Sequence, residues 1–316
     1  MKNVLWFSDT SMKDISVVGG KNASLGEMIS NLSKKGIEVP DGFSITTHAY
    51  DRYLQHNNLV DKLSDILEKL DHDDHINLKR SGLKIRTLIQ DGKFPEDIYS
   101  EIVESYRILS RKYKDADGNP QEKTDVAVRS SGTAEDLPDA SFAGQQETYL
   151  NVRGKSRLIE SVKNCFASLF TDRAISYRKK IGYDSKKVKI SVGIQKMVRS
   201  DLGSSGVAFT VDPTSGLKGA VLVNGSFGLG ENIVGGKITP DEFILSKRNL
   251  KNLDYPILDK KLGDKSFKMI YDTNPRNQVK NVKVPEEERH RFCISDLNLM
   301  RLGRWCLEIE DYYSEK

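Results

Sequence analysis

The sequence has few cysteines and no long apolar run, and these two absences exclude several classes of protein. The three cysteines, Cys165, Cys293 and Cys306, lie far apart and form no Cys-x-x-Cys pair, so neither a disulfide scaffold nor a zinc cluster is expected. No uncharged stretch approaches the roughly 20 residues that cross a bilayer, and the first residues lack the apolar segment of a secretory signal. We therefore expect a cytoplasmic protein with no membrane partner.

A large excess of charge of either sign is also absent. The 49 Lys and Arg residues against 45 Asp and Glu residues leave a formal charge of +4 at pH 7, which does not favour a nucleic-acid partner. The five histidines show no HExxH or similar ligand spacing, and no Ser/His/Asp arrangement is evident, so covalent hydrolysis is not favoured. What remains is a chain of 316 residues, long enough for about two domains.

Hydrophobic periodicity divides the chain into a helical part and a strand-rich part. Apolar residues at helical spacing predict helices around 21–35, 60–70, 83–89, 98–109, 158–169 and 299–309. Short apolar or β-branched runs predict strands at 126–128, 188–194, 206–212, 220–224, 242–246 and 267–271, of which 188–194 alternates as a half-buried strand does. We therefore expect an α+β fold of two lobes, one helix-rich at 1–185 and one β-rich at 186–316.

The tripeptide Gly19-Gly20-Lys21 precedes the first predicted helix. A helix start presents free backbone N–H groups and the positive end of a dipole, and a lysine there adds an ammonium group, which together suit a phosphate. The stretch is not a Walker A loop, because Asn22 replaces the required Ser or Thr and the upstream glycine spacing differs. The alternative is a turn followed by a solvated lysine, in which Asn22, Ser24 and Glu27 are ordinary first-turn residues.

Two polar loops follow the predicted strand at 126–128. The first, Arg129–Asp136, combines a guanidinium group with hydroxyl and carboxylate side chains, which suits a triphosphate and its metal ion. The second, Ser141–Thr148, is rich in small residues whose N–H groups can wrap phosphates. Surface turns are the alternative for both loops.

Two later segments suit the rest of a nucleotide. Gln195–Val198 ends a predicted strand near the lobe junction and can offer backbone donors and acceptors to an adenine edge; a plain edge strand is the alternative. Gly225–Glu231 has the order GxxGxG rather than the dinucleotide order GxGxxG. Glu231 suits a contact to a metal ion or a ribose, and an ordinary glutamate at a helix start is the alternative.

Six blocks of sequence, in register along the chain, resemble the N-terminal nucleotide-binding domain of the phosphoenolpyruvate synthase (pyruvate, water dikinase) family. The blocks are VVGGKNASLGEM at 17–28, PDGF at 40–43, VRSSGTAED at 128–136, PDASFAGQQET at 138–148, FASLFTDRAISYR at 166–178 and GLGE at 228–231. Pyruvate phosphate dikinase and rifampicin phosphotransferase share this domain. The loop at 141–146 and the stretch Met197–Leu202 are most similar to the synthase.

The resemblance implies an ATP-grasp-type fold in which ATP, with Mg²⁺, lies between two lobes. By position it assigns Lys21 and Arg129 to the phosphates as the catalytic pair, with Gly19 and Gly20 beside the lysine. It assigns the remaining nucleotide contacts to a loop that covers the phosphates (Ser141, Gly144, Gln145, Gln146, Thr148), to an adenine hinge (Gln195, Met197, Val198) and to Glu231 on the ribose or adenine side.

The resemblance also implies a reaction that needs more than this stretch of chain. In the family, the domain transfers the β-phosphoryl group of ATP to a histidine on a swivelling domain, which then phosphorylates pyruvate on a barrel domain, and AMP, phosphate and phosphoenolpyruvate result. The 316 residues do not include the family's later Asp-Ile-Glu-Trp-Ala and Gln-Ala-Arg-Pro-Glu-Thr segments, which carry the metal-binding acid, nor the phosphohistidine and pyruvate-binding domains. We therefore expect weak or metal-impaired ATP binding, no turnover without those domains, and a homodimeric full-length form. Two other hypotheses are the ATP-binding module of a rifampicin-type phosphotransferase and a non-catalytic nucleotide-binding domain.

Overall fold

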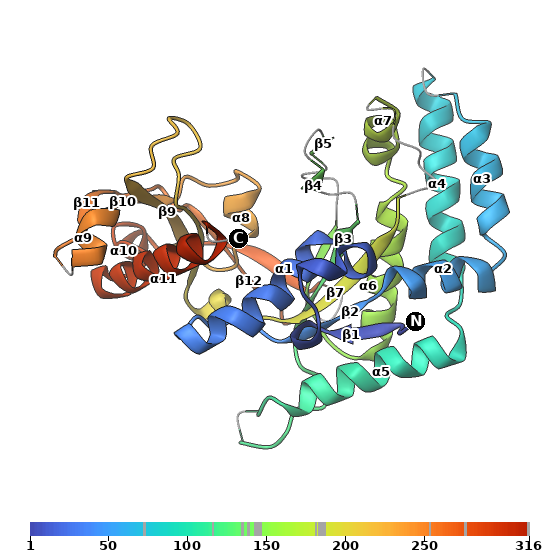
Figure 1. Ribbon diagram of the computed structural model, residues 1–316, viewed down its shortest axis with the longest axis horizontal. Helices are drawn as coiled ribbons and strands as arrows, with labels where there is room; N and C mark the ends of the chain where they lie inside the picture. The colour runs from blue at the N-terminus through green and yellow to red at the C-terminus, as the bar shows by residue number, and fades with distance from the viewer. Residues whose placement is uncertain are drawn as a thin grey trace. The chain divides into compact units, whose positions relative to one another are not determined.

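The computed structural model describes residues 1–71, 74–115, 117–133, 136–137, 140–141, 147–180, 182, 188–252, 254–274 and 277–314, with the backbone alone at 136–137 and 140–141. The chain divides into two compact units, Met1–Met197 and Val198–Lys316. Each unit combines helices with antiparallel sheets, so the predicted α+β class is confirmed (Figure 1). No helix within the described ranges is both long and apolar enough to span a membrane.

A five-stranded antiparallel sheet in the order β1-β2-β7-β3-β6 organises the first unit. Its strands are β1 (Val4–Trp6), β2 (Gly42–Ile45), β3 (Val126–Gly132), β6 (Thr148–Val152) and β7 (Ile190–Lys196). Strand β7 pairs with β2 on one side and with β3 on the other, so it is a central strand and the edge-strand alternative is wrong. It is also buried on both faces rather than half-buried, because Ser191 and Gly193 lie against Asn22 of a covering helix.

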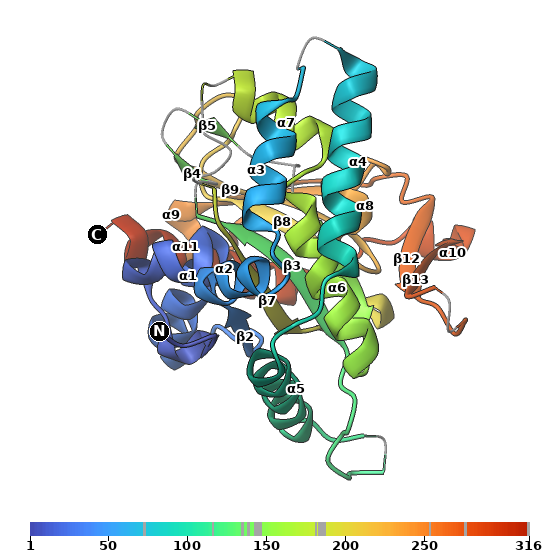
Figure 2. The same ribbon diagram turned by 90° about the vertical axis from the view of Figure 1, so that its right-hand side faces the viewer.

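Helices cover both faces of this sheet (Figure 2). Helix α1 (Ile15–Leu32) packs on β2, β3 and β7, and α6 (Lys155–Ser168) packs on β3, β6 and β7, with α4 (His75–Asp91) outside it. The apolar side chains of the sheet, such as Val128 and Ile194, belong to the core that includes Phe166 of α6. The other elements of the unit are α2 (Thr47–His56), α3 (Val60–Glu68), α5 (Glu96–Arg111), α7 (Asp172–Lys180), and the short pair β4 (Asp136–Leu137) and β5 (Ala140–Ser141).

The second unit is built on a four-stranded antiparallel sheet in the order β11-β10-β9-β8. Its strands are β8 (Ser204–Phe209), β9 (Ala220–Phe227), β10 (Asp241–Ser246) and β11 (Ile257–Lys261), and β12 (Phe267–Tyr271) pairs separately with β13 (Val279–Lys283). The helices are α8 (Glu231–Val234), α9 (Lys247–Asn252), α10 (Glu286–Arg289) and α11 (Asp296–Ser314). Leu299 and Cys306 of α11 join Val221, Phe243 and Leu245 of the sheet in a small core.

The compact units meet at Met197 and Val198. Strand β7 belongs to the first unit because both of its pairing partners do. The arrangement of a nucleotide between two lobes, at 1–185 and 186–316, stays a prediction. Short 3₁₀ helices lie at Phe7–Asp9, Met12–Asp14, Ser33–Lys35 and Ser200–Leu202.

Candidate functional site

A break in helix α1 at Gly19 gives Lys21 its position. Gly19 has a φ of 74° and a ψ of 163°, within a segment that is otherwise helical. A Cβ atom at this residue would lie 2.3 Å from Ser131 Oγ and 2.4 Å from Ser131 O, so the backbone of Gly19 touches the end of β3. Glycine is therefore required both for the positive φ and for the close approach. A new helical segment begins after it, with Lys21 in the first turn.

Ser131 anchors the start of that segment to the sheet. Its Oγ accepts a hydrogen bond from the backbone N–H of Asn22 at 3.3 Å, so a distant strand supplies the cap of the helical segment. Asn22 Nδ2 donates to Ser191 Oγ at 3.1 Å, and a Cβ at Gly193 would lie 2.3 Å from Asn22 Oδ1. Asn22 is only 2% exposed. It is therefore a positioning residue, and its assignment as an ordinary first-turn residue is wrong.

Arg129 shares the face of the sheet on which this segment of α1 docks. Side chains alternate along a strand, so Arg129 and Ser131 of β3 lie on one face. Arg129 is opposite Gly193 in the β3–β7 register and opposite Thr148 in the β3–β6 register, and directly opposed residues of an antiparallel pair share a face. Lys21 and Arg129, both half-buried, thus come from the same side of the sheet. Gly193 adds no side chain next to Arg129.

Gln195 lies on the same face, two residues beyond Gly193 in β7. Its side chain is nearly buried and its Nε2 donates to Pro40 O at 3.0 Å. This hydrogen bond engages the Gln195 side chain within the first unit. The backbone N–H groups of Lys196 and Met197 are likewise engaged, by Asp41 O at 2.9 Å and Asp125 O at 3.1 Å.

Asp125 holds the end of β7 in place. Its Oδ1 lies 2.9 Å from Lys196 Nζ, and its backbone oxygen accepts from Met197 N at 3.1 Å. Met197 is buried and ends the first unit, whereas Val198 is 62% exposed and begins the second. The segment predicted as the adenine hinge therefore includes the junction of the two units.

The other predicted site residues are distributed as follows. Ser141 lies in β5 and pairs with Asp136 of β4, and Gly144, Gln145 and Gln146 lie outside the described residues. Glu231 starts α8 in the second unit and is exposed. The structure thus brings Gly19, Gly20, Lys21, Arg129, Thr148 and Gln195 to one face of the first sheet.

The side chains on this face have a chemistry that suits an anion. It joins an ammonium group, a guanidinium group and the start of a helix, each of which favours negative charge. Within the described ranges, no group of three or more His, Cys, Asp or Glu side chains is arranged to hold a metal ion.

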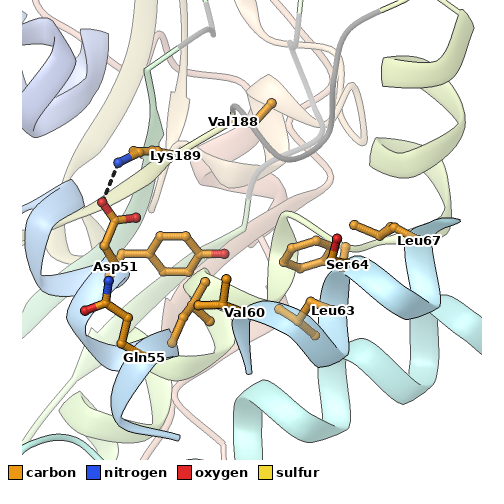
Figure 3. A pocket seen from close by; sticks show the side chains of 11 residues that line it. Asp51, Gln55, Val60, Leu63, Ser64, Leu67, Val188 and Lys189 are labelled. Atoms are coloured by element: carbon orange, nitrogen blue, oxygen red, sulfur yellow. Dashed lines mark hydrogen bonds and ion pairs between the residues drawn. The ribbon is translucent and has the colours of Figure 1, made fainter. Parts of the chain in front are cut away.

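The first unit also contains a cavity of about 390 Å³. Figure 3 shows the residues that line it. Apolar side chains of α3, including Val60, Leu63 and Leu67, line it, and Asp51 and Lys189 form an ion pair at one end. Burial raises the pKa of Tyr50, which also lines the cavity. None of the site residues that the structure describes lines this cavity, so it belongs to the helical side of the unit and not to the candidate site.

Comparison with known proteins gives one family and a series of close relatives. The family described as "Pyruvate phosphate dikinase, AMP/ATP-binding domain" matches residues 15–316. The phosphoenolpyruvate synthase of Aquifex aeolicus is 51% identical over 99% of this chain and 36% of its own length. Those of Synechocystis sp. and Helicobacter pylori are 50% and 46% identical over 98% and 100% of the chain, and in each case the match covers 38% of the relative. The chain thus spans well under half the length of these relatives.

Proposed function

Because the chain belongs to the pyruvate phosphate dikinase AMP/ATP-binding domain family, we propose that the face carrying Lys21 and Arg129 binds the phosphates of ATP. The observation that carries the proposal is the break at Gly19, which starts a helix against the end of β3. Lys21 enters from that helix and Arg129 from the strand. A triphosphate is strongly anionic, and it would gain from both cations and from the free N–H groups of the helix start.

The remaining contacts of the nucleotide follow from the resemblance to phosphoenolpyruvate synthases. We propose an ATP-grasp-type arrangement in which ATP lies between the lobes at 1–185 and 186–316. The phosphate-covering loop would contribute Ser141, Gly144, Gln145, Gln146 and Thr148, the adenine hinge Gln195, Met197 and Val198, and the ribose or adenine side Glu231. Gly19 and Gly20 would contribute backbone N–H groups.

Within a full-length enzyme, this part would supply the phosphoryl donor. The reaction would convert ATP, pyruvate and water into AMP, phosphoenolpyruvate and phosphate through a phosphohistidine on another domain, in a cytoplasmic and homodimeric enzyme. Phosphoryl transfer asks a protein mainly for positioning and for cations around the transferred group, which are the roles proposed for Lys21 and Arg129. The metal ion would arrive with the substrate as Mg·ATP, held by phosphate oxygens and water.

Calorimetric titration with Mg·ATP tests the phosphate site. The Lys21→Gln variant should bind Mg·ATP about tenfold or more weakly than the parent protein, because a charge-assisted contact to phosphate is lost. Lys34→Gln removes the same charge from an exposed position at the far end of the α1 region and should bind as the parent protein does. Equal affinity of the parent and Lys21→Gln would exclude Lys21 from the site.

The role as phosphoryl donor needs a separate test. The phosphohistidine domain of a related phosphoenolpyruvate synthase is added in trans, with ATP labelled at its β-phosphate. Label should appear on the histidine with the parent protein and not with Lys21→Gln. Tight binding of ATP without any transfer of label would instead support a non-catalytic nucleotide-binding domain.

A further inference from the structure

A second cavity of the first unit, of about 550 Å³, is surrounded by cationic side chains. Its walls come from α5, from the residues before β3 and from the start of α6, together with Arg153. Six of the residues that line it are cationic: Arg107, Arg111, Lys123, Arg153, Lys155 and Arg157. Glu122 is the one carboxylate among the described lining residues.

Three of these cations have a carboxylate nearby: Arg107 and Arg111 both interact with Glu104, and Arg153 lies near Asp125. Arg107 donates to both oxygens of Glu104, at 2.7 and 2.5 Å. Arg153 Nη2 lies 4.0 Å from Asp125 Oδ1, but that oxygen is already engaged at 2.9 Å by Lys196. Asp125 is therefore shared between Arg153 and Lys196.

The other three cations have no such partner. Over the described ranges, Lys123, Lys155 and Arg157 form no ion pair with a carboxylate. Like charges that converge on one cavity repel one another, and the repulsion is relieved when an anion binds between them. The cluster therefore has the electrostatic character of an anion site in the absence of its ligand.

The start of helix α6 adds to this positive potential. Its N-cap residue, Gly154, has a φ of 81° and provides no side-chain cap, and Gly154–Arg157 all line the cavity. The N–H of Gly154 donates to Tyr106 Oη at 2.9 Å. The N–H groups that follow at a helix start have no partner within the helix, so they can serve a ligand.

We propose that this cavity binds a phosphorylated small molecule that carries at least two negative charges. The volume lies within the roughly 300–1,000 Å³ typical of small-molecule sites, and cations from several chain segments converge on a concave surface. The proposal does not depend on ATP binding at Lys21 and Arg129. The cavity adjoins the end of β7, because Arg153 shares Asp125 with Lys196.

Backbone amide NMR with inorganic pyrophosphate as the probe tests this site. Pyrophosphate should shift the amide signals of residues 154–157 in a saturable manner. The Lys155→Gln/Arg157→Gln double variant should bind about tenfold more weakly, since two charge-assisted contacts are lost. Lys79→Gln/Lys84→Gln removes two charges from the exposed side of α4 and should bind as the parent protein does. Absence of shifts at 154–157, or equal weakening in both double variants, would overturn the proposal.

Two further experiments distinguish the proposed site from other anion sites. The Lys21→Gln variant should keep the pyrophosphate response at 154–157; loss of that response would show that it originates elsewhere and would refute a separate site. A polyglutamate peptide is titrated in parallel. If the peptide shifts these amides and pyrophosphate does not, the cavity is a docking surface for an acidic protein segment and the small-molecule proposal is wrong.

Discussion

The Oγ of Ser131 accepts a hydrogen bond from the backbone N–H of Asn22 across 109 residues of sequence. This bond joins the end of β3 to the helical segment that follows Gly19, and it fixes where Lys21 enters the site. Arg129 lies two residues before Ser131 on the same strand. The relative position of the two cations is therefore set by the contact between Gly19, Asn22 and Ser131.

Replacement of Gly19 by alanine should disturb this contact. The added Cβ would meet Ser131 Oγ at 2.3 Å and would also be held at a positive φ. Each effect costs about 1–3 kcal/mol, so we expect a loss of about 2–6 kcal/mol in the free energy of unfolding. Urea denaturation measures the loss. Gly36→Ala is the matched control, because Gly36 has a φ of 77° and open space around its Cβ position, and it should lose only about 1 kcal/mol. Equal losses in the two variants would show that the approach to Ser131 is not tight.

Gly193 and Asn22 should be coupled energetically. Gly193→Ala places a Cβ 2.3 Å from Asn22 Oδ1 and should destabilise the protein. In an Asn22→Ala background that oxygen is absent, so the same substitution should cost about 1–2 kcal/mol less. A double-mutant cycle of urea denaturation measures the difference. Additive effects would mean that the Asn22 side chain moves aside freely.

Periodicity predicted the elements that carry a regular apolar pattern and missed several that do not. Helices α3 to α6 and α11 and strands β8, β9, β10 and β12 carry regular apolar patterns, and the structure contains each of them. Strands β1 and β2 have three and four residues, too few for a period to be recognised. Helix α2 buries Ala49, Tyr50 and Tyr53, and tyrosine gives a weak apolar signal because it also carries a hydroxyl group.

The candidate site could be predicted only as separate blocks. The lysine after two glycines and the arginine after a strand are both visible in the sequence. The bond between Asn22 and Ser131 is not, because local sequence carries no information about a partner 109 residues away. One signal was available: Gly193 lies inside a strand pattern, where glycine often marks the close approach of another part of the chain.

Arg129 should be necessary for stabilisation by nucleotide. A ligand that binds the folded state raises the melting temperature, and the rise grows with the logarithm of the ratio of ligand concentration to Kd once that ratio is large. With Mg·ATP present, Arg129→Ala should therefore lose most of the rise in Tm that the parent protein shows in differential scanning fluorimetry. Arg80→Ala, which removes an exposed arginine of α4, should keep it. An unchanged rise in Arg129→Ala would remove Arg129 from the site.

The buried ion pair of the second unit should be essential to its stability. Asp241 and Lys265 are both fully buried, and Asp241 also accepts from the backbone N–H of Gly263 and of Cys293, each at 2.8 Å. Asp241→Asn would leave the Lys265 ammonium without a counter-charge and should cost about 3–5 kcal/mol. In a Trp6→Phe background, fluorescence of Trp305 in α11 reports unfolding of this unit alone, because Trp6 and Trp305 are the two tryptophans of the sequence. Glu242→Gln, which breaks the exposed pair with Lys261, should cost at most about 1 kcal/mol; a similar loss in both variants would contradict the role of burial.

Cys293 should make the second unit less stable at high pH. Burial and the nearby Asp241 carboxylate raise the pKa of its thiol to about 12, whereas a thiol in an unfolded chain has a pKa of about 8.5. Between these values the unfolded chain releases a proton that the folded protein keeps, so stability from this group is complete below about pH 8.5 and falls as the pH rises through about 12. Cys293→Ala should therefore show a shallower decline in unfolding free energy between about pH 8.5 and 10.5 than the parent protein.

The raised pKa also keeps the native Cys293 thiol protonated and therefore unreactive. Iodoacetamide at about pH 8.5 should alkylate Cys293 slowly in buffer and rapidly in urea. Rapid labelling of the native protein, located by peptide mass spectrometry, would show that the thiolate forms in the folded state.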